Sequence, residues 1–261
     1  MMHPSTFIND LWNGNTENEI FVAMSFDDSY TSRFNDVYKP AIENIAIEGE
    51  PLKAIRVDER KSGDSIITEI IKGICHAEIV LADISSMESS EEGVNVNRNG
   101  NVMYELGLAH ASKSPASVII IKDDHEKMLF DVSSIPHFTI DFSDVESAKK
   151  EIIGIITDRI KEAETILDIK LIKFSKSMQP HELGVLKKIA LCPPNHFMDF
   201  SFEVSKTRIV SNPDSKGLAG LLPHGIIQSH VVKESNFPFY SLTHRGRKLC
   251  KLLNIELAKQ Q

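Results

Sequence analysis

The carboxylate Glu105 is the side chain of this sequence that is best placed to do chemistry. It lies in the segment Asn99–Ala111, one helical turn beyond an expected helix start and after an apolar run that reads as a strand. Its neighbours Leu106 and Gly107 supply apolar packing and a close approach to a sheet. A glutamate here would stand at the rim of a ligand pocket while its helix stays anchored in the core. From spacing alone, the alternative is an acid that only complements the positive end of the helix dipole.

Strands that alternate with helices are expected to position this carboxylate. Strands are predicted over 19–26, 52–57, 78–83, 117–121 and 138–142, and helices over 31–47, 66–74, 101–112 and 145–167. Such alternation is typical of a parallel sheet covered on both faces, whose ligands bind beyond the C-terminal strand ends. We therefore expect an α/β domain over residues 19–169, with a flavodoxin-like or Rossmann-like five-stranded parallel sheet. Residues 1–18 form an N-terminal extension.

A polar segment, 85–100, separates the third strand from the helix of Glu105. It is rich in Ser, Glu, Asn and Gly and has no apolar pattern. Two interpretations stay open, because such a loop either covers a pocket or is an insertion without a function.

A second domain is predicted over residues 175–261. Helices are expected over 181–191, 216–229 and 244–257, and two strands over 231–233 and 239–243. The order of two helices, a two-stranded wing and a helix resembles a winged-helix domain. The stretches Gly225–Ile227 and Tyr240–Gly246 carry that resemblance.

The string Asn-Val-Met-Tyr-Glu-Leu-Gly-Leu-Ala-His-Ala, which begins at Asn101, resembles a hallmark of a known family. This family comprises the nucleoside 2-deoxyribosyltransferases and the TIR-like nucleotide-binding domains. Three further similar pieces follow the expected order: Phe21–Phe26 for the first strand, Arg56–Glu59 for the second strand end, and Ala82–Ser85 for the third. The resemblance covers about residues 19–122.

The resemblance implies that Glu105 attacks, or stabilises charge at, the anomeric carbon of a nucleoside, a nucleotide or NAD. Breaking an N-glycosidic bond builds positive charge on the ribose ring, which a carboxylate can pair with or trap as an ester. It also implies a sugar-holding role for Asp83. The expected substrate-binding residues are Ser25, Phe26, Asp27, Asp83, Asn101 and Tyr104. NAD is expected only as a substrate, and the sequence predicts no cofactor and no metal.

Structural interpretations of the same residues remain beside these. Asp83 is equally well explained as a strand-end acid that caps the following turn. His110 is expected to be a packed or capping residue, because its spacing from Glu105 places it elsewhere on the helix. The segment Arg56–Glu59 reads as a solvated strand end as readily as a substrate contact.

Charge is distributed unevenly along the chain. Residues 1–169 carry 15 Lys/Arg and 31 Asp/Glu, whereas residues 170–261 carry 14 Lys/Arg and 6 Asp/Glu, so the net charge changes from −16 to +8. A basic C-terminal part fits contact with nucleic-acid phosphates or with an acidic protein surface. The candidate nucleic-acid contacts are Lys206, Arg208, Lys216, Arg245, Arg247 and Lys248.

Composition excludes several other classes. The chain of 261 residues is 41% hydrophobic and 25% charged, as is usual for a protein with an ordinary core, and no apolar run approaches a bilayer-spanning length. The start of the chain does not read as a signal peptide. Three widely spaced cysteines predict reduced thiols in a cytoplasmic protein. No phosphate-binding glycine motif is present.

Three function classes follow. The first is an enzyme that cleaves or transfers an N-glycosidic bond. The second is a module that senses a nucleotide without turning it over and signals through the winged helix. The third is a DNA-binding regulator with a nucleotide effector pocket. A homo-oligomer is expected from the family resemblance, and no membrane partner is expected.

Overall fold

The chain forms two compact units, residues 1–164 and 165–261. The computed structural model describes residues 17–47, 49–57, 66–87, 97–123, 134–193, 196, 198–204, 207–231 and 237–258.

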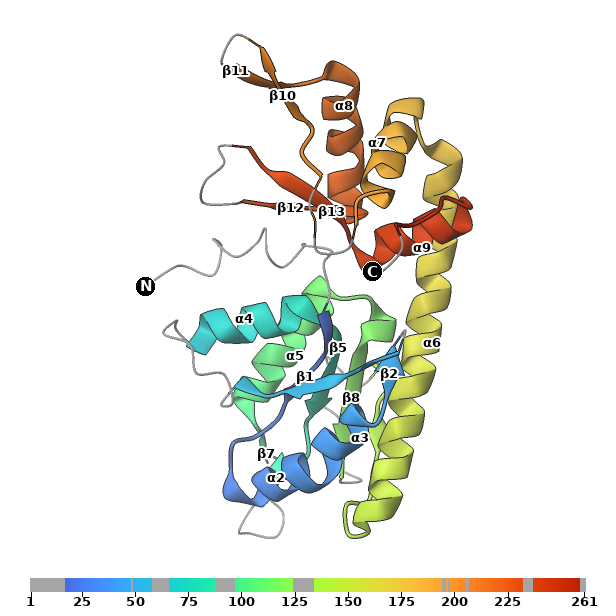
Figure 1. Cartoon of the computed structure of the whole chain (residues 1–261). Helices are drawn as coiled ribbons and strands as arrows, with labels where there is room; N and C mark the ends of the chain where they lie inside the picture. The colour runs from blue at the N-terminus through green and yellow to red at the C-terminus, as the bar shows by residue number, and fades with distance from the viewer. Residues whose placement is uncertain are drawn as a thin grey trace. The chain divides into compact units, whose positions relative to one another are not determined.

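A five-stranded parallel sheet forms the centre of the first unit (Figure 1). In spatial order its strands are β4 (Lys53–Ile55), β1 (Glu17–Ala23), β5 (Ala77–Asp83), β8 (Val118–Lys122) and β9 (Phe138–Thr139). All four neighbouring pairs are parallel. Counted along the chain, this order is 2-1-3-4-5, which is the flavodoxin-like arrangement. The predicted fold class of this unit is confirmed.

Helices cover both faces of this sheet because its strands are apolar on both sides. One face packs against α2 (Asp28–Arg33), the π-helical segment η2 (Phe34–Tyr38), α3 (Lys39–Glu43) and the first half of α6 (Val145–Ser177). The other face packs against α4 (Ile66–His76) and α5 (Gly100–Ser112) (Figure 1). The crossover helix α5 therefore connects β5 to β8 on the second face.

Several predicted boundaries are wrong. The helix expected to reach residue 47 ends at Glu43, because Ala46–Ile47 (β2) pairs with Glu50–Pro51 (β3). The helix expected to end at residue 167 continues to Ser177 as α6. Its last turns continue because Leu171 and Phe174 pack into the apolar core of the second unit.

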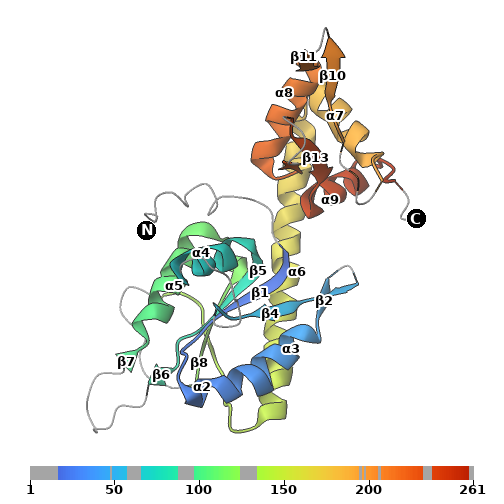
Figure 2. The same cartoon turned by 60° about the vertical axis from the view of Figure 1, so that its left-hand side comes forward.

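The predicted polar loop 85–100 begins and ends in paired backbone. Short strands β6 (Ser86–Met87) and β7 (Asn97–Arg98) are antiparallel and lie at the same end of the sheet as α2 (Figure 2). The Tyr30 hydroxyl donates to the Ser86 carbonyl across 3.0 Å, and Arg98 donates to the Ile84 carbonyl. The middle of the loop, 88–96, lies outside the described residues.

The second unit has its own apolar core. In chain order its elements after α6 are α7 (Pro180–Ala190), β10 (Ser201–Val204), β11 (Thr207–Val210), α8 (Asn212–Leu221), the 3₁₀ turn η6 (Leu222–His224), β12 (Ile227–His230), β13 (Phe239–Leu242) and α9 (His244–Leu252). The strands form two antiparallel pairs, β10 with β11 and β12 with β13. Their helices and strands contribute jointly to one buried cluster.

Several predicted boundaries of this unit are wrong: the helix expected over 216–229, the strand expected over 231–233, which lies at Ile227–His230, and the helix expected to reach 257, which ends at Leu252. The helix expected over 216–229 ends at Leu221, since Gly225 takes a left-handed conformation with φ 62° and starts a turn into β12. The hairpin of β10 and β11 was not predicted. Helix α9 begins after Thr243, whose hydroxyl accepts the Gly246 N–H across 3.1 Å. The winged-helix assignment remains a prediction.

Candidate functional site

The C-terminal ends of β1 and β5 lie side by side at the point where the strand order reverses. In open α/β sheets, ligands bind in the crevice beyond the strand ends at such a point. Ser25 follows β1 there and is buried. Its hydroxyl oxygen accepts the Asp27 N–H across 3.3 Å, which shapes the turn into α2.

Helix α5 is tied to the end of β1 through its first residues. Asn99 caps the helix, because its side-chain oxygen accepts the N–H groups of Asn101 at 3.0 Å and Val102 at 3.4 Å. The side-chain nitrogen of the same residue donates to the Ser25 hydroxyl across 3.3 Å. The helix that bears Glu105 therefore starts at the strand edge where ligands of this fold bind.

Glu105 is a buried carboxylate in the second turn of α5. Only 6% of the residue is exposed. Three apolar residues close to it along the same helix, Val102, Leu106 and Ala109, are also buried. Burial raises the pKa of Glu105 to about 7. Within the described part of the chain, its carboxylate has no hydrogen bond or ion pair.

These properties argue against a simple helix-dipole role for Glu105. A carboxylate that only complements the positive helix end lies in the first turn and is stabilised in its charged form. The first turn of α5 has no acidic residue, and the raised pKa shows that the charged form of Glu105 is disfavoured. A buried acid that titrates near neutral pH is typical of functional sites.

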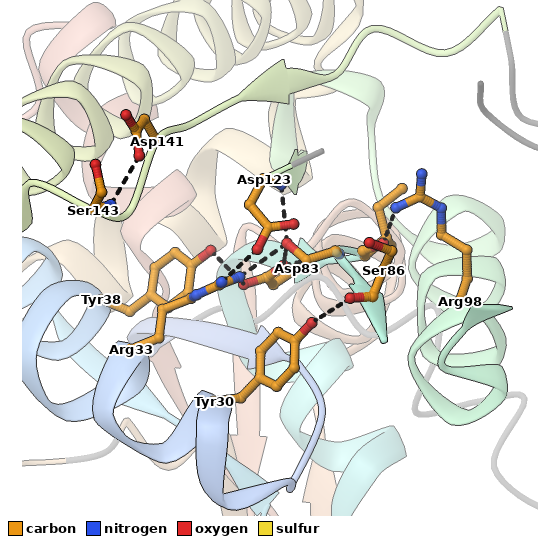
Figure 3. Close-up of polar contacts among 11 residues, drawn as sticks. Tyr30, Arg33, Tyr38, Asp83, Ser86, Arg98, Asp123, Asp141 and Ser143 are labelled. Atoms are coloured by element: carbon orange, nitrogen blue, oxygen red, sulfur yellow. Dashed lines mark hydrogen bonds and ion pairs between the residues drawn. The ribbon is translucent and has the colours of Figure 1, made fainter. Parts of the chain in front are cut away.

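Asp83, at the end of β5, accepts four hydrogen bonds from the protein (Figure 3). Its Oδ1 accepts from the Ser85 N–H at 3.0 Å and the Ser85 hydroxyl at 2.5 Å. Its Oδ2 accepts from Arg33 Nη1 at 2.9 Å and from the Tyr38 hydroxyl at 2.8 Å. Four hydrogen bonds, two to each oxygen, use the acceptor capacity of an ionised carboxylate. This geometry favours the turn-capping interpretation over direct contact with a sugar.

Arg33 links Asp83 to Asp123, which directly follows β8. Its Nη2 donates to Oδ2 of Asp123 across 2.6 Å, and its guanidinium carbon lies 4.7 Å from the ring centre of Tyr30 and 3.9 Å from that of Phe142. Burial alone would lower the pKa of Arg33. The charge of Asp83 and the hydrogen bonds to both carboxylates outweigh it, so the pKa lies above its ordinary value.

Buried Tyr38 belongs to the same group. Burial raises the pKa of its phenol well above the ordinary value, and the neighbouring Asp83 charge adds to the shift. Tyr38 is therefore a neutral donor that fixes one side of the Asp83 carboxylate. Its ring also meets Phe142 edge to face, with centroids 5.7 Å apart.

The remaining predicted substrate residues are exposed. Phe26 and Tyr104 expose large parts of their rings, and Asp27 and Asn101 are also exposed. Arg56 is buried, with its guanidinium carbon 5.6 Å from the ring centre of Phe26 and 4.7 Å from that of Phe34. The interpretation of this segment as a solvated strand end is therefore wrong for Arg56. Asp58 and Glu59 lie outside the described residues.

Sequence reasoning missed Arg33, Tyr38 and Asp123. Asp123 had a usable signal, because an acid that directly follows an apolar strand is placed like Asp83. No comparable signal marks Arg33 or Tyr38, whose partners are 50 and 45 residues away. His110, in contrast, is partly buried as expected, and burial lowers its pKa.

The predicted nucleic-acid contacts belong to the second unit. Lys216 on α8 and Arg247 on α9 are exposed, Arg245 is partly buried, and Lys248 pairs with Asp168 across 3.1 Å. Arg247 also donates to the Leu242 carbonyl across 3.3 Å. Lys206 and the side chain of Arg208 lie outside the described part of the chain.

The strand order and the helices on both faces define a flavodoxin-like α/β protein, whose crossover helix α5 carries the buried carboxylate Glu105. No protein-family model matches the chain, and no curated protein matches it significantly. Among solved structures it is similar to a 2-desoxiribosyltransferase from Leishmania mexicana, at 15% identity, over 52% of this chain and 97% of that one. The TM-score of this likeness is 0.33.

The described residues lack two further features. Among the described helices, none is both long and apolar enough to cross a membrane. Over the same residues, no three His, Cys, Asp or Glu side chains gather in a way that would hold a metal ion.

Proposed function

We propose that the first unit cleaves or transfers the N-glycosidic bond of a nucleoside, a nucleotide or NAD, with Glu105 at the anomeric carbon. The observation that carries this proposal is the buried Glu105 carboxylate, whose pKa burial raises to about 7, on a helix that starts where the strand order of the sheet reverses. Desolvation makes such a carboxylate a strong partner for developing positive charge, because electrostatic attraction is stronger where the local dielectric is low.

The reaction begins with ionised Glu105 facing the C1′ carbon of the sugar. The bond between C1′ and the base nitrogen breaks, and its electron pair leaves with the base. The base of a nucleoside or nucleotide takes up a proton from water, whereas the nicotinamide of NAD leaves as a neutral molecule. The cationic sugar is stabilised by the carboxylate or trapped as its ester. Water then gives hydrolysis, and a second base gives transfer. NAD enters this scheme as a substrate that releases nicotinamide.

The other residues have supporting roles in this proposal. Asp83 positions Arg33 and the Ser85 turn and does not touch the sugar, because its oxygens are occupied. Ser25 and Asn99 hold the start of α5 at the strand edge. The exposed rings of Phe26 and Tyr104 offer flat apolar faces to a base.

Chromatography of reaction mixtures tests the proposal. Purified protein is incubated with NAD, ribonucleosides, deoxynucleosides and their 5′-monophosphates, with and without a second free base. The Glu105→Gln variant keeps the shape of the side chain but cannot ionise. Glu151→Gln on α6 is the matched control, because Glu151 is exposed.

Release of free base by the wild type and by Glu151→Gln, but not by Glu105→Gln, is the expected result. Free base appearing only when a second base is present would identify a transferase. Binding without base release across the whole panel would overturn the enzymatic proposal and favour the nucleotide-sensing alternative.

A further inference from the structure

Asp123 is the acid at the strand edge whose carboxylate is only partly used by the protein. It directly follows β8, and 28% of its side chain is exposed. Its Oδ2 accepts from Arg33 Nη2 at 2.6 Å. Within the described part of the chain, Oδ1 has no hydrogen-bond partner. Of the two oxygens, the described residues therefore hold one and leave the other without a donor.

The contrast with Asp83 is informative, because both acids end neighbouring parallel strands. The side chain of Asp83 is completely buried and accepts four hydrogen bonds. Arg33 bridges the two carboxylates. An arginine shared by two carboxylates leaves a net negative charge, which disfavours a phosphate at this place and favours a hydrogen-bond donor.

The available oxygen is held in a fixed position. The Asp123 N–H donates to the Ser85 hydroxyl oxygen across 3.0 Å, and that hydroxyl donates to Asp83. Arg33, which holds the other oxygen, is packed against the rings of Tyr30 and Phe142. A rigid acceptor loses little conformational freedom when a donor binds.

Asp123 also lies at the edge that the proposed reaction uses. Strands β1, β5 and β8 are consecutive in the sheet, and the start of α5 is tied to the end of β1. The axes of β1 and β8 are two strand spacings apart, which is about 10 Å. A single nucleoside can span that distance from the Ser25 end of the edge to Asp123.

We propose that Asp123 receives a hydroxyl group of the sugar and so selects ligands with an unmodified pentose over deoxygenated analogues. This inference rests on the proposed function for the ligand class, but it concerns binding and not bond cleavage. Arg33 acts as the positioning residue that aims the carboxylate.

Calorimetric titration tests this inference in a Glu105→Gln background, where ligands are bound without turnover. The probes are adenosine, guanosine, cytidine and uridine, each beside its 2′,3′-dideoxy and 5′-deoxy analogue. The measured quantity is the ratio of dissociation constants between analogue and parent. This ratio is compared between the Glu105→Gln protein and the same protein that also carries Asp123→Asn. Asp158→Asn on α6 is the control for loss of an exposed charge.

With Asp123 intact, we expect at least one deoxygenated analogue to bind about 10-fold to 100-fold more weakly than its parent, as for loss of a hydrogen bond to a charged acceptor. Asp123→Asn should reduce that ratio several-fold by weakening the parent more than the analogue. Asp123→Glu, which keeps the charge but moves the oxygens, should reduce it as well. Asp158→Asn should leave the ratio unchanged.

A merely structural role for Asp123 would lower the affinity for parent and analogue equally, and that result overturns the inference. It is equally overturned if no probe distinguishes the hydroxyl groups, or if no nucleoside binds. The proposed function fails on a different result. If the protein released no base but still showed a hydroxyl preference that depends on Asp123, the enzymatic proposal would be wrong and the binding role of Asp123 would stand.

Discussion

Arg33 donates from Nη1 to Oδ2 of Asp83 across 2.9 Å, although the two residues are 50 positions apart in the chain. The pair ties α2 to the end of β5, and the side chain of Asp83 within it is fully shielded from water. Through its second nitrogen, Arg33 extends the same tie to the end of β8. The edge on which a ligand would rest is therefore held by ionic contacts as well as by the apolar core.

Removal of Arg33 should strongly destabilise the protein. Arg33→Met leaves Asp83 charged, buried and without its cation, so we expect the free energy of unfolding to fall by about 3–5 kcal/mol. Urea unfolding followed by circular dichroism measures this. Lys161→Met is the control, since the pair of Lys161 with Asp158 is exposed and should change stability by less than about 1 kcal/mol. Equal effects of the two substitutions would contradict a structural role for the Arg33 pair.

The pH dependence of turnover distinguishes two roles of Glu105. With a pKa of about 7, the residue is protonated at pH 5.5 and ionised at pH 8.5. As nucleophile or ion-pair partner it must be ionised, so kcat/KM should rise with pH through about 7 and then level off. A rate that falls through this range would instead assign it the role of a general acid.

Glu105 should also make stability depend on pH. Its pKa is raised on folding, from 4.5 to about 7, so its contribution is fully present below pH 4.5 and is lost as pH rises through about 7. The shift corresponds to roughly 3 kcal/mol. Glu105→Gln removes this dependence, and we expect the variant to gain stability over the wild type between pH 5 and pH 8. Melting temperatures of the variant and the wild type at pH 5 and pH 8 measure this gain. If the difference between the two proteins were the same at both pH values, Glu105 would not be desolvated.

Packing of α4 on β1 requires a glycine at position 73. A methyl group at Gly73 would come within 2.4 Å of the buried Phe21 ring, so Gly73→Ala should cost about 1–3 kcal/mol. Gly154→Ala on α6 is the matched control, because its added methyl group meets no atom within 4 Å. It should stabilise the protein by about 0.5–1 kcal/mol through helix propensity. Thermal unfolding of both variants tests the pair, and similar losses would contradict the close contact.

Local sequence patterns are sufficient to predict the five parallel strands, the helices between them and the position of Glu105 on the helix after the third strand. These features follow from apolar periodicity and from a local motif, which are properties of neighbouring residues. The same local patterns gave wrong boundaries where contacts with residues far away in the sequence determine the secondary structure. Apolar residues after position 167 extend α6 because they find a core in the second unit, and the strand β12 replaces a predicted helix because it pairs with β13.

Only the tertiary structure decided what the acids at the strand edge do. Asp83 and Asp123 both follow apolar strands, so local sequence cannot tell which is occupied and which is open. Arg33 and Tyr38 come from a distant segment and occupy Oδ2 of Asp83, whereas Oδ1 of Asp123 has no hydrogen-bond partner among the described residues. Likewise the pKa of Glu105 is set by the loss of water around it. Burial and long-range pairing depend on how the whole chain packs, and for that reason no local pattern encodes them.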